Sequence, residues 1–139
     1  MPTMGENPRR RTDNQHAGDA AELLVAERLA AIGWRILARN VHCGRSELDI
    51  VATDPGPPAR LVVVEVRWRS SRAFGSAEET FDFRKRAHLT SGIGRLLELG
   101  RLPDGVELPR LPMSLDLAVV EPGPAGKPSV RLYRNALLG

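Results

Sequence analysis

The sequence predicts an α/β protein in which helices pack around a mixed β-sheet. Two segments carry apolar residues at helical spacing, and five short runs rich in Val, Leu and Ile indicate strands. The elements follow the order helix, three strands, helix, two strands, which is typical of an α/β sandwich. A tight turn after the first strand further predicts that the sheet begins with antiparallel hairpins.

The first helix is expected from about Ala17 to Ile32, where Gly33 provides a stop signal. The polar, proline-containing residues 1–14 lack periodicity and are expected to form a disordered basic arm. Residues 15–139 are then a single domain, long enough to bury one core. The apolar residues with helical spacing are Ala21, Leu24, Val25, Leu29 and Ile32.

The strands are delimited by turn signals. Gly44-Arg45-Ser46 predicts a hairpin turn between the first two strands, and the Pro-rich segment 54–58 separates the second from the third. A second helix is expected from Ser76 or Ala77 to about Gly100. The expected strands cover about 34–43, 47–52, 60–69, 114–120 and 129–134.

Composition narrows the class of protein. The 139 residues carry a net charge of +3, and 18 of the 20 basic residues are Arg. Arginine binds phosphate bidentately, which favours a nucleic-acid partner, although codon bias in a GC-rich genome explains the same excess. One cysteine, no signal peptide and no apolar run of about 20 residues predict a cytoplasmic protein without a membrane partner.

The most informative feature is the set of charged residues inside two apolar strands. Period-two alternation places Glu65 and Arg67 on one face of the third expected strand, with Trp68 on the opposite, core face. Asp49 interrupts the preceding strand in the same way. Charges seldom enter such strands unless they are solvated, paired or metal-bound. We therefore expect Asp49 and Glu65 to converge as ligands of a divalent metal.

Neighbouring residues extend this candidate site. Glu22 on the first helix is offset from the apolar stripe and is expected to reach a bridging water or a second metal, and Arg67 to hold a phosphate. Arg69, Arg72 and Lys85 are candidate nucleic-acid contacts along a phosphate track. The alternative is a pair of ordinary acids at a sheet margin that Arg67 and Arg69 neutralise.

Four segments follow one another in a fixed order along the chain: Gly18-Asp-Ala-Ala-Glu22, Gly33-Trp-Arg-Ile-Leu-Ala-Arg-Asn40, Ser46-Glu-Leu-Asp-Ile-Val51 and Val64-Glu-Val-Arg-Trp-Arg69. Together they resemble the YraN-like family of bacterial proteins, over roughly residues 17–121. Phe74-Gly75, Lys85 and Asp116 also fit the pattern of that family.

The resemblance implies a restriction-endonuclease-like, three-layer sandwich of the PD-(D/E)xK nuclease superfamily. In that pattern Asp49 and Glu65 bind Mg²⁺ or Mn²⁺, Arg67 occupies the position of the usual Lys, and Glu22 is the helix acid of the resolvase-like branch. The chain departs from the pattern at Arg67, because an Arg stabilises phosphate charge but cannot act as a base. Smaller departures are Ser46 in place of Gly and Ser114-Leu115 in place of an Arg-Phe pair.

The sequence thus predicts a nucleic-acid-binding protein with a metal-dependent nuclease site. Two alternatives stay open: a non-catalytic nucleic-acid-binding module that keeps the fold, and a protein-interaction scaffold whose carboxylates merely pair with Arg. The choice between DNA and RNA is also open, as is a homodimer.

Overall fold

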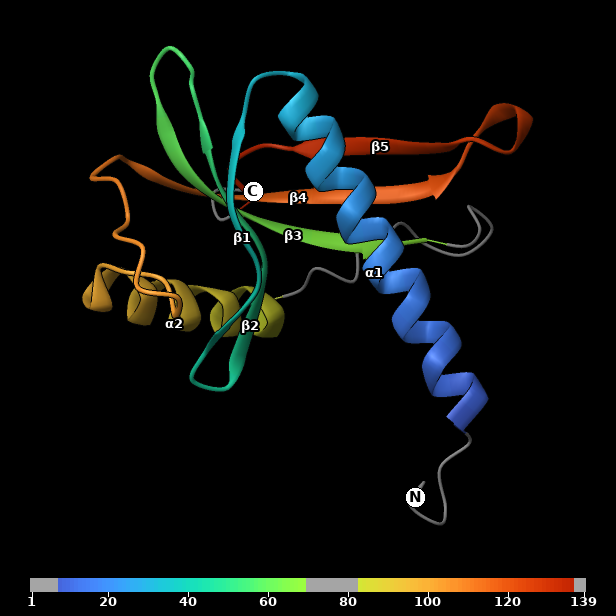
Figure 1. Cartoon of the computed structure of the whole chain (residues 1–139), viewed down its shortest axis with the longest axis horizontal. Helices are drawn as coiled ribbons and strands as arrows, with labels where there is room; N and C mark the ends of the chain where they lie inside the picture. Colours follow the sequence, from blue (N-terminus) through green and yellow to red (C-terminus); the bar gives the residue numbers. More distant parts are fainter. Residues whose placement is uncertain (1–7, 70–82, 137–139) are drawn as a thin grey trace.

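The computed structural model describes residues 8–69 and 83–136, which form one mixed sheet with helices against it (Figure 1). The side chains described are those of residues 18–69 and 85–136. In chain order the elements are α1 (Pro8–Ala31), β1 (Arg35–Cys43), β2 (Ser46–Asp54), β3 (Arg60–Trp68), α2 (Phe83–Leu99), β4 (Met113–Pro122), a 3-10 turn (Pro124–Gly126) and β5 (Pro128–Tyr133).

The five strands lie side by side in the order of the sequence. The pairs β1–β2, β2–β3 and β4–β5 are antiparallel, whereas β3 and β4 are parallel. A parallel pair needs a crossover connection, and α2 lies within the one between β3 and β4. The predicted mixed sheet, with its antiparallel hairpins first, is confirmed.

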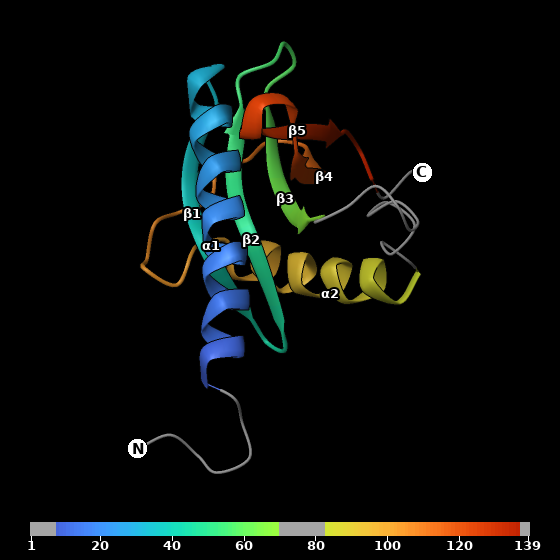
Figure 2. The ribbon, with the colours of Figure 1, turned by 90° about the vertical axis from the view of Figure 1, so that its right-hand side faces the viewer.

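The two helices cover opposite faces of the sheet, which gives three layers (Figure 2). The alternation of β3 supplies both cores: Val62 and Val64 pack on the α1 side, and Leu61 and Val63 on the α2 side. All four are fully buried. The α/β sandwich predicted from the sequence is therefore the observed architecture. From the helices, Ala21, Val25, Ala26 and Leu29 complete the α1-side core, and Leu89, Ile93 and Leu96 the α2-side core.

The start of α1 and the exposure of Trp68 differ from what the sequence predicted. α1 begins at Pro8 rather than near Ala17, so residues 8–14 are helical and not a disordered arm. The expected start of the second helix at Ser76 or Ala77 lies outside the described residues. Trp68 does face the α1 side but is 46% exposed, because it is the last residue of β3, at the edge of the area that α1 covers.

Asp116, which fits the family pattern, is fully buried and belongs to an ionic group apart from the other acids. Its carboxylate pairs with the guanidinium of Arg134 and accepts a hydrogen bond of 3.0 Å from the backbone N–H of Asn135. Arg134 also binds Asp54 at 2.8 Å and lies over the ring of Trp34. Burial raises the pKa of Asp116, and the hydrogen bond from Asn135 and the charge of Arg134 oppose that rise. The group fastens the chain after β5 to β2 and β4.

Within the described parts of the chain, no helix combines the length and apolar character needed to cross a bilayer.

Candidate functional site

Asp49 lies where strands β2 and β3 separate. Their ladder runs from the pair Asp54–Arg60 to the pair Ile50–Val64 and stops there. Beyond that pair the backbone N–H of Val66 donates to the Asp49 carboxylate, at 2.8 Å. A side-chain oxygen thus replaces the strand carbonyl that a continued ladder would supply, and this bond holds the carboxylate at the fork.

A kink in the β1–β2 hairpin accompanies this fork. The register contains Arg39–Ile50 and Val41–Leu48 but no bridge between them, and Asn40 has a φ of 54°. Asn tolerates this left-handed conformation better than most residues. The kink explains why Leu48 packs in the α2-side core while Ile50 packs in the α1-side core. A regular strand would place these two residues on the same face, because side chains two positions apart point the same way.

Four carboxylates gather around the fork. Oxygens of Glu22, Glu47 and Asp49 all lie within 4.8 Å of one another. Glu65, only 4% exposed, contacts the carboxyl of Asp49 from β3. The Asn40 side chain, with its nitrogen turned toward the acids, donates to Glu22 at 2.8 Å and to Glu47 at 3.0 Å. One helix and two strands therefore bring their acids to a single place.

The pKa values of two of these acids reflect the crowding. Burial, together with the hydrogen bond and negative charge of Asp49, raises the pKa of Glu22 to about 8. Burial and Asp49 likewise raise the pKa of Glu65 to about 7. Arg39, with Nη2 3.9 Å from Oε2 of Glu22, opposes only part of this effect. The cluster thus holds more negative charge than its neighbours compensate, and a bound cation would relieve it.

Two cations approach Glu65 from different elements. The Nε of Arg67 and the Nζ of Lys85 each lie 3.5 Å from Oε1 of Glu65. Arg67 is two residues further along β3, whereas Lys85 comes from the first part of α2. Both side chains are partly exposed, at 29% and 39%. An ammonium group therefore stands beside the strand acid even though the strand itself carries an Arg.

The structure brings together the three acids that the sequence predicted and adds a fourth. Asp49, Glu65 and Glu22 do converge, and Glu47, which the prediction omitted, joins them. Its signal was available, because Glu47 lies two residues before Asp49 in the same strand. A metal at this fork thus has candidate ligands beyond the expected pair of Asp49 and Glu65.

The structure places Arg69, one of the residues expected to contact phosphate, in an ion pair inside the protein. The side chain of Arg69 is 13% exposed, with Nη1 3.9 Å from Oε2 of the fully buried Glu121, so Arg69 serves an internal ion pair. The parallel register of β3 and β4 explains this ion pair. Arg67 lies beside Val119 and Trp68 beside Val120, so the next residue, Arg69, comes to lie beside Glu121. Arg72 lies outside the described residues.

The chemistry of the donors favours a hard cation. Glu22, Glu47 and Asp49 offer only carboxylate oxygens, with no sulfur or imidazole within the described cluster. Oxygen ligands suit Mg²⁺, Mn²⁺ and Ca²⁺ rather than soft metals. The cluster can therefore hold a divalent cation.

Fold and site together define a class: a three-layer α/β protein with an acidic cluster able to bind a metal at the fork of two strands. The chain belongs to the uncharacterised protein family UPF0102, whose model matches residues 21–120. This is the YraN-like family that the sequence motifs suggested, and that expectation is confirmed.

Relatives in the same family occur in several organisms. A UPF0102 protein of Symbiobacterium thermophilum is 39% identical over 123 residues, covering 88% of this chain and 97% of its own. A UPF0102 protein of Methylococcus capsulatus is 35% identical over 120 residues, covering 86% and 89%. Among solved structures, Pyrococcus furiosus SfsA in complex with Ca²⁺ matches 87% of this chain and 63% of its own, with 17% identity and a TM-score of 0.35.

Proposed function

We propose that this protein is a nuclease that uses Mg²⁺ or Mn²⁺ to hydrolyse phosphodiester bonds in nucleic acid. The observation that carries the proposal is the convergence of Glu22, Glu47, Asp49 and Glu65 at one fork, with Arg67 and Lys85 against the last of them. Carboxylates beside cations are what a metal-assisted attack on a phosphate requires. The restriction-endonuclease-like assignment is part of this proposal.

Asp49 would hold the metal with Glu65, Glu22 and Glu47 as the further candidate ligands. A bound divalent ion polarises the phosphoryl oxygen and lowers the pKa of water. The chain contributes a fixed place for that ion, because the Val66 N–H immobilises the Asp49 carboxylate and Asn40 ties Glu22 to Glu47. Such preorganisation removes reorganisation from the reaction itself.

Lys85 takes the role that the motif assigns to a strand lysine. An ammonium has three donors and can exchange a proton, whereas a guanidinium remains charged. From its position beside Glu65, Lys85 would orient the attacking water and donate to a non-bridging oxygen. Arg67, with its planar fork of donors, would bind the phosphate. Phosphate binding and orientation of the attacking water, which the motif assigns to one strand lysine, are thus divided between Arg67 on β3 and Lys85 on α2.

The test is a cleavage panel with Mn²⁺ or Mg²⁺ on a flap, a four-way junction, single-stranded DNA and structured RNA. We expect metal-dependent nicking of at least one substrate, and a loss of roughly 10²-fold in Lys85→Ala, since one stabilising donor is removed. Arg110→Ala, which removes an exposed loop cation, is the matched control. Failure to cleave any of the four substrates with either metal would refute the proposed nuclease function. Equal cleavage rates in Lys85→Ala and Arg110→Ala would exclude the role of Lys85 but leave the nuclease function in place.

A second candidate function is a non-catalytic nucleic-acid-binding module. The observation in its favour is the Arg67–Glu65 ion pair, in which an Arg at the usual Lys position already neutralises the buried acid. This candidate predicts binding that weakens with salt, measured by fluorescence anisotropy, without cleavage by the native protein. Arg67→Lys should then gain metal-dependent cleavage. Cleavage by the native chain rules this candidate out.

A further inference from the structure

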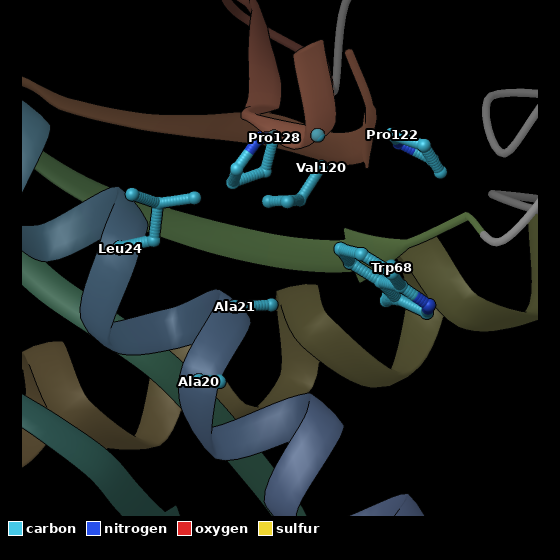
Figure 3. Close-up of a pocket in the computed structure, with 8 residues that line it drawn as sticks. Ala20, Ala21, Leu24, Trp68, Val120, Pro122 and Pro128 are labelled. Atoms are coloured by element: carbon cyan, nitrogen blue, oxygen red, sulfur yellow. The ribbon is translucent and has the colours of Figure 1, made fainter. Parts of the chain in front are cut away.

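An apolar groove of about 340 Å³ lies on the α1 side of the sheet, where α1 faces the ends of β3 and β4 (Figure 3). Its size falls within the range of small-ligand sites. Figure 3 shows the indole of Trp68 across from the helix and below the turn between β4 and β5. The groove is lined chiefly by Ala21, Leu24, Trp68, Val120, Pro122 and Pro128.

Trp68 gives this groove an aromatic wall that is open to solvent. Its side chain is 46% exposed, whereas the other tryptophan, Trp34, is 6% exposed and packed in the α1-side core. A flat ring on one wall and short or rigid side chains on the others suit a flat ligand. Exposed aromatic rings of this kind form the stacking platforms of single-strand binders.

The groove adjoins the acidic cluster along two elements. On α1, the groove residue Ala21 directly precedes Glu22. On β3, Val66 binds Asp49 through its N–H, and Trp68 lies two residues further, about 7 Å at a rise of 3.3 Å per residue. Stacked nucleotides repeat about every 3.4 Å along a strand. The groove is therefore one to two nucleotides from the proposed cleavage site.

The rim of the groove is cationic. Lys127 is exposed between the groove residues Gly126 and Pro128, and the guanidinium of Arg28 donates to the backbone oxygen of Pro128 at 2.8 Å. An apolar slot beneath cations complements a base that is attached to a phosphate. An uncharged apolar peptide would match the slot but not its rim.

We propose that this groove binds an unpaired nucleobase of the nucleic-acid substrate, stacked on Trp68, with its phosphate against Lys127. The inference rests on the proposed function for its substrate class and adds that the substrate has a single-stranded or frayed segment beside the scissile bond. Trp68 is then a specificity-determining residue for unpaired strands and not a catalytic one.

The experiment uses the full chain labelled with 5-fluorotryptophan, whose two ¹⁹F resonances are assigned with Trp68→Phe. A single-stranded oligonucleotide in EDTA should shift the Trp68 resonance and leave that of buried Trp34 in place, while a blunt duplex should shift neither. Trp68→Leu should weaken single-strand binding roughly tenfold. Leu97→Ala, at an equally exposed apolar position on α2, is the matched control.

The outcomes separate this inference from the nuclease proposal. A strand that binds without moving the Trp68 resonance overturns the groove assignment, even when cleavage occurs. A Trp68 shift in both native and Asp49→Asn protein supports the groove, even when neither cleaves. A Trp68 resonance that changes on dilution, with a halved mass in light scattering, assigns the groove to a second copy of the chain and overturns the nucleobase.

Discussion

We expect Asp49→Asn to lose metal-dependent cleavage by at least about 10³-fold, since the Lewis-acid contribution of a metal is worth several kcal/mol. Asp49 touches every other acid of the cluster, so its loss removes the shared ligand. The Asn oxygen can still accept the Val66 N–H, and one negative charge leaves a crowded site. The folded state should therefore be at least as stable as that of the native chain. Initial nicking rates and thermal melting curves measure the two effects.

Glu27→Gln is the matched control for Asp49→Asn, because it removes an exposed carboxylate on α1. It should keep both the nicking rate and the melting temperature of the native protein. Nicking by Asp49→Asn at a rate near that of Glu27→Gln would exclude the fork as the catalytic site. A large loss of stability in Asp49→Asn would contradict the view that the Asp49 carboxylate repels its acidic neighbours.

The second large effect concerns the pH dependence of stability in the metal-free protein. The pKa of Glu22 is about 8 and that of Glu65 about 7 in the folded state, against 4.5 for both when unfolded. Between these values the folded chain binds protons that the unfolded chain has lost, so the free energy of unfolding falls as pH rises. We expect a loss of several kcal/mol between pH 5 and pH 8, at about 1.4 kcal/mol per pKa unit for one group.

Thermal or urea unfolding in EDTA, followed at unit steps of pH, measures this loss. Glu22→Gln should flatten the pH profile, while Glu27→Gln should reproduce the native slope. Mn²⁺ should stabilise the protein more at pH 8 than at pH 5, because the metal must displace protons at the lower pH. A melting temperature that is flat or rises from pH 5 to pH 8 without metal would show that the acids are not crowded as described.

Local periodicity explains how much of the site the sequence could predict. Alternation correctly placed Glu65 and Arg67 on one face of β3, where they form an ion pair, because a regular strand repeats every two residues whatever surrounds it. Helical spacing likewise placed Ala21, Val25 and Leu29 on the core face of α1. It was wrong for Ile32, which follows the end of the helix and is 66% exposed, and it missed the start at Pro8. The same alternation could have identified Glu47, which lies two residues before Asp49 in β2.

Contacts between distant residues could not be read from such periodicity. The kink at Asn40 and Asp49 exchanges the face of Leu48, and it depends on a backbone conformation that no spacing encodes. Arg69 turns to Glu121 because the parallel register of β3 and β4 makes them neighbours. Trp68 is exposed because β3 reaches the edge of the area that α1 covers.

The sequence by itself determined the α/β class, the strand that carries Glu65 and Arg67, and the acids that would have to meet. Only the tertiary structure decided that β2 and β3 part at Asp49 and that Lys85 reaches Glu65 from α2. The physical reason is that strand alternation is a property of neighbouring residues, whereas the crossover through α2 is fixed by burial of its apolar side on the sheet. The Arg in the strand and the Lys on the helix become one site only when that packing is complete.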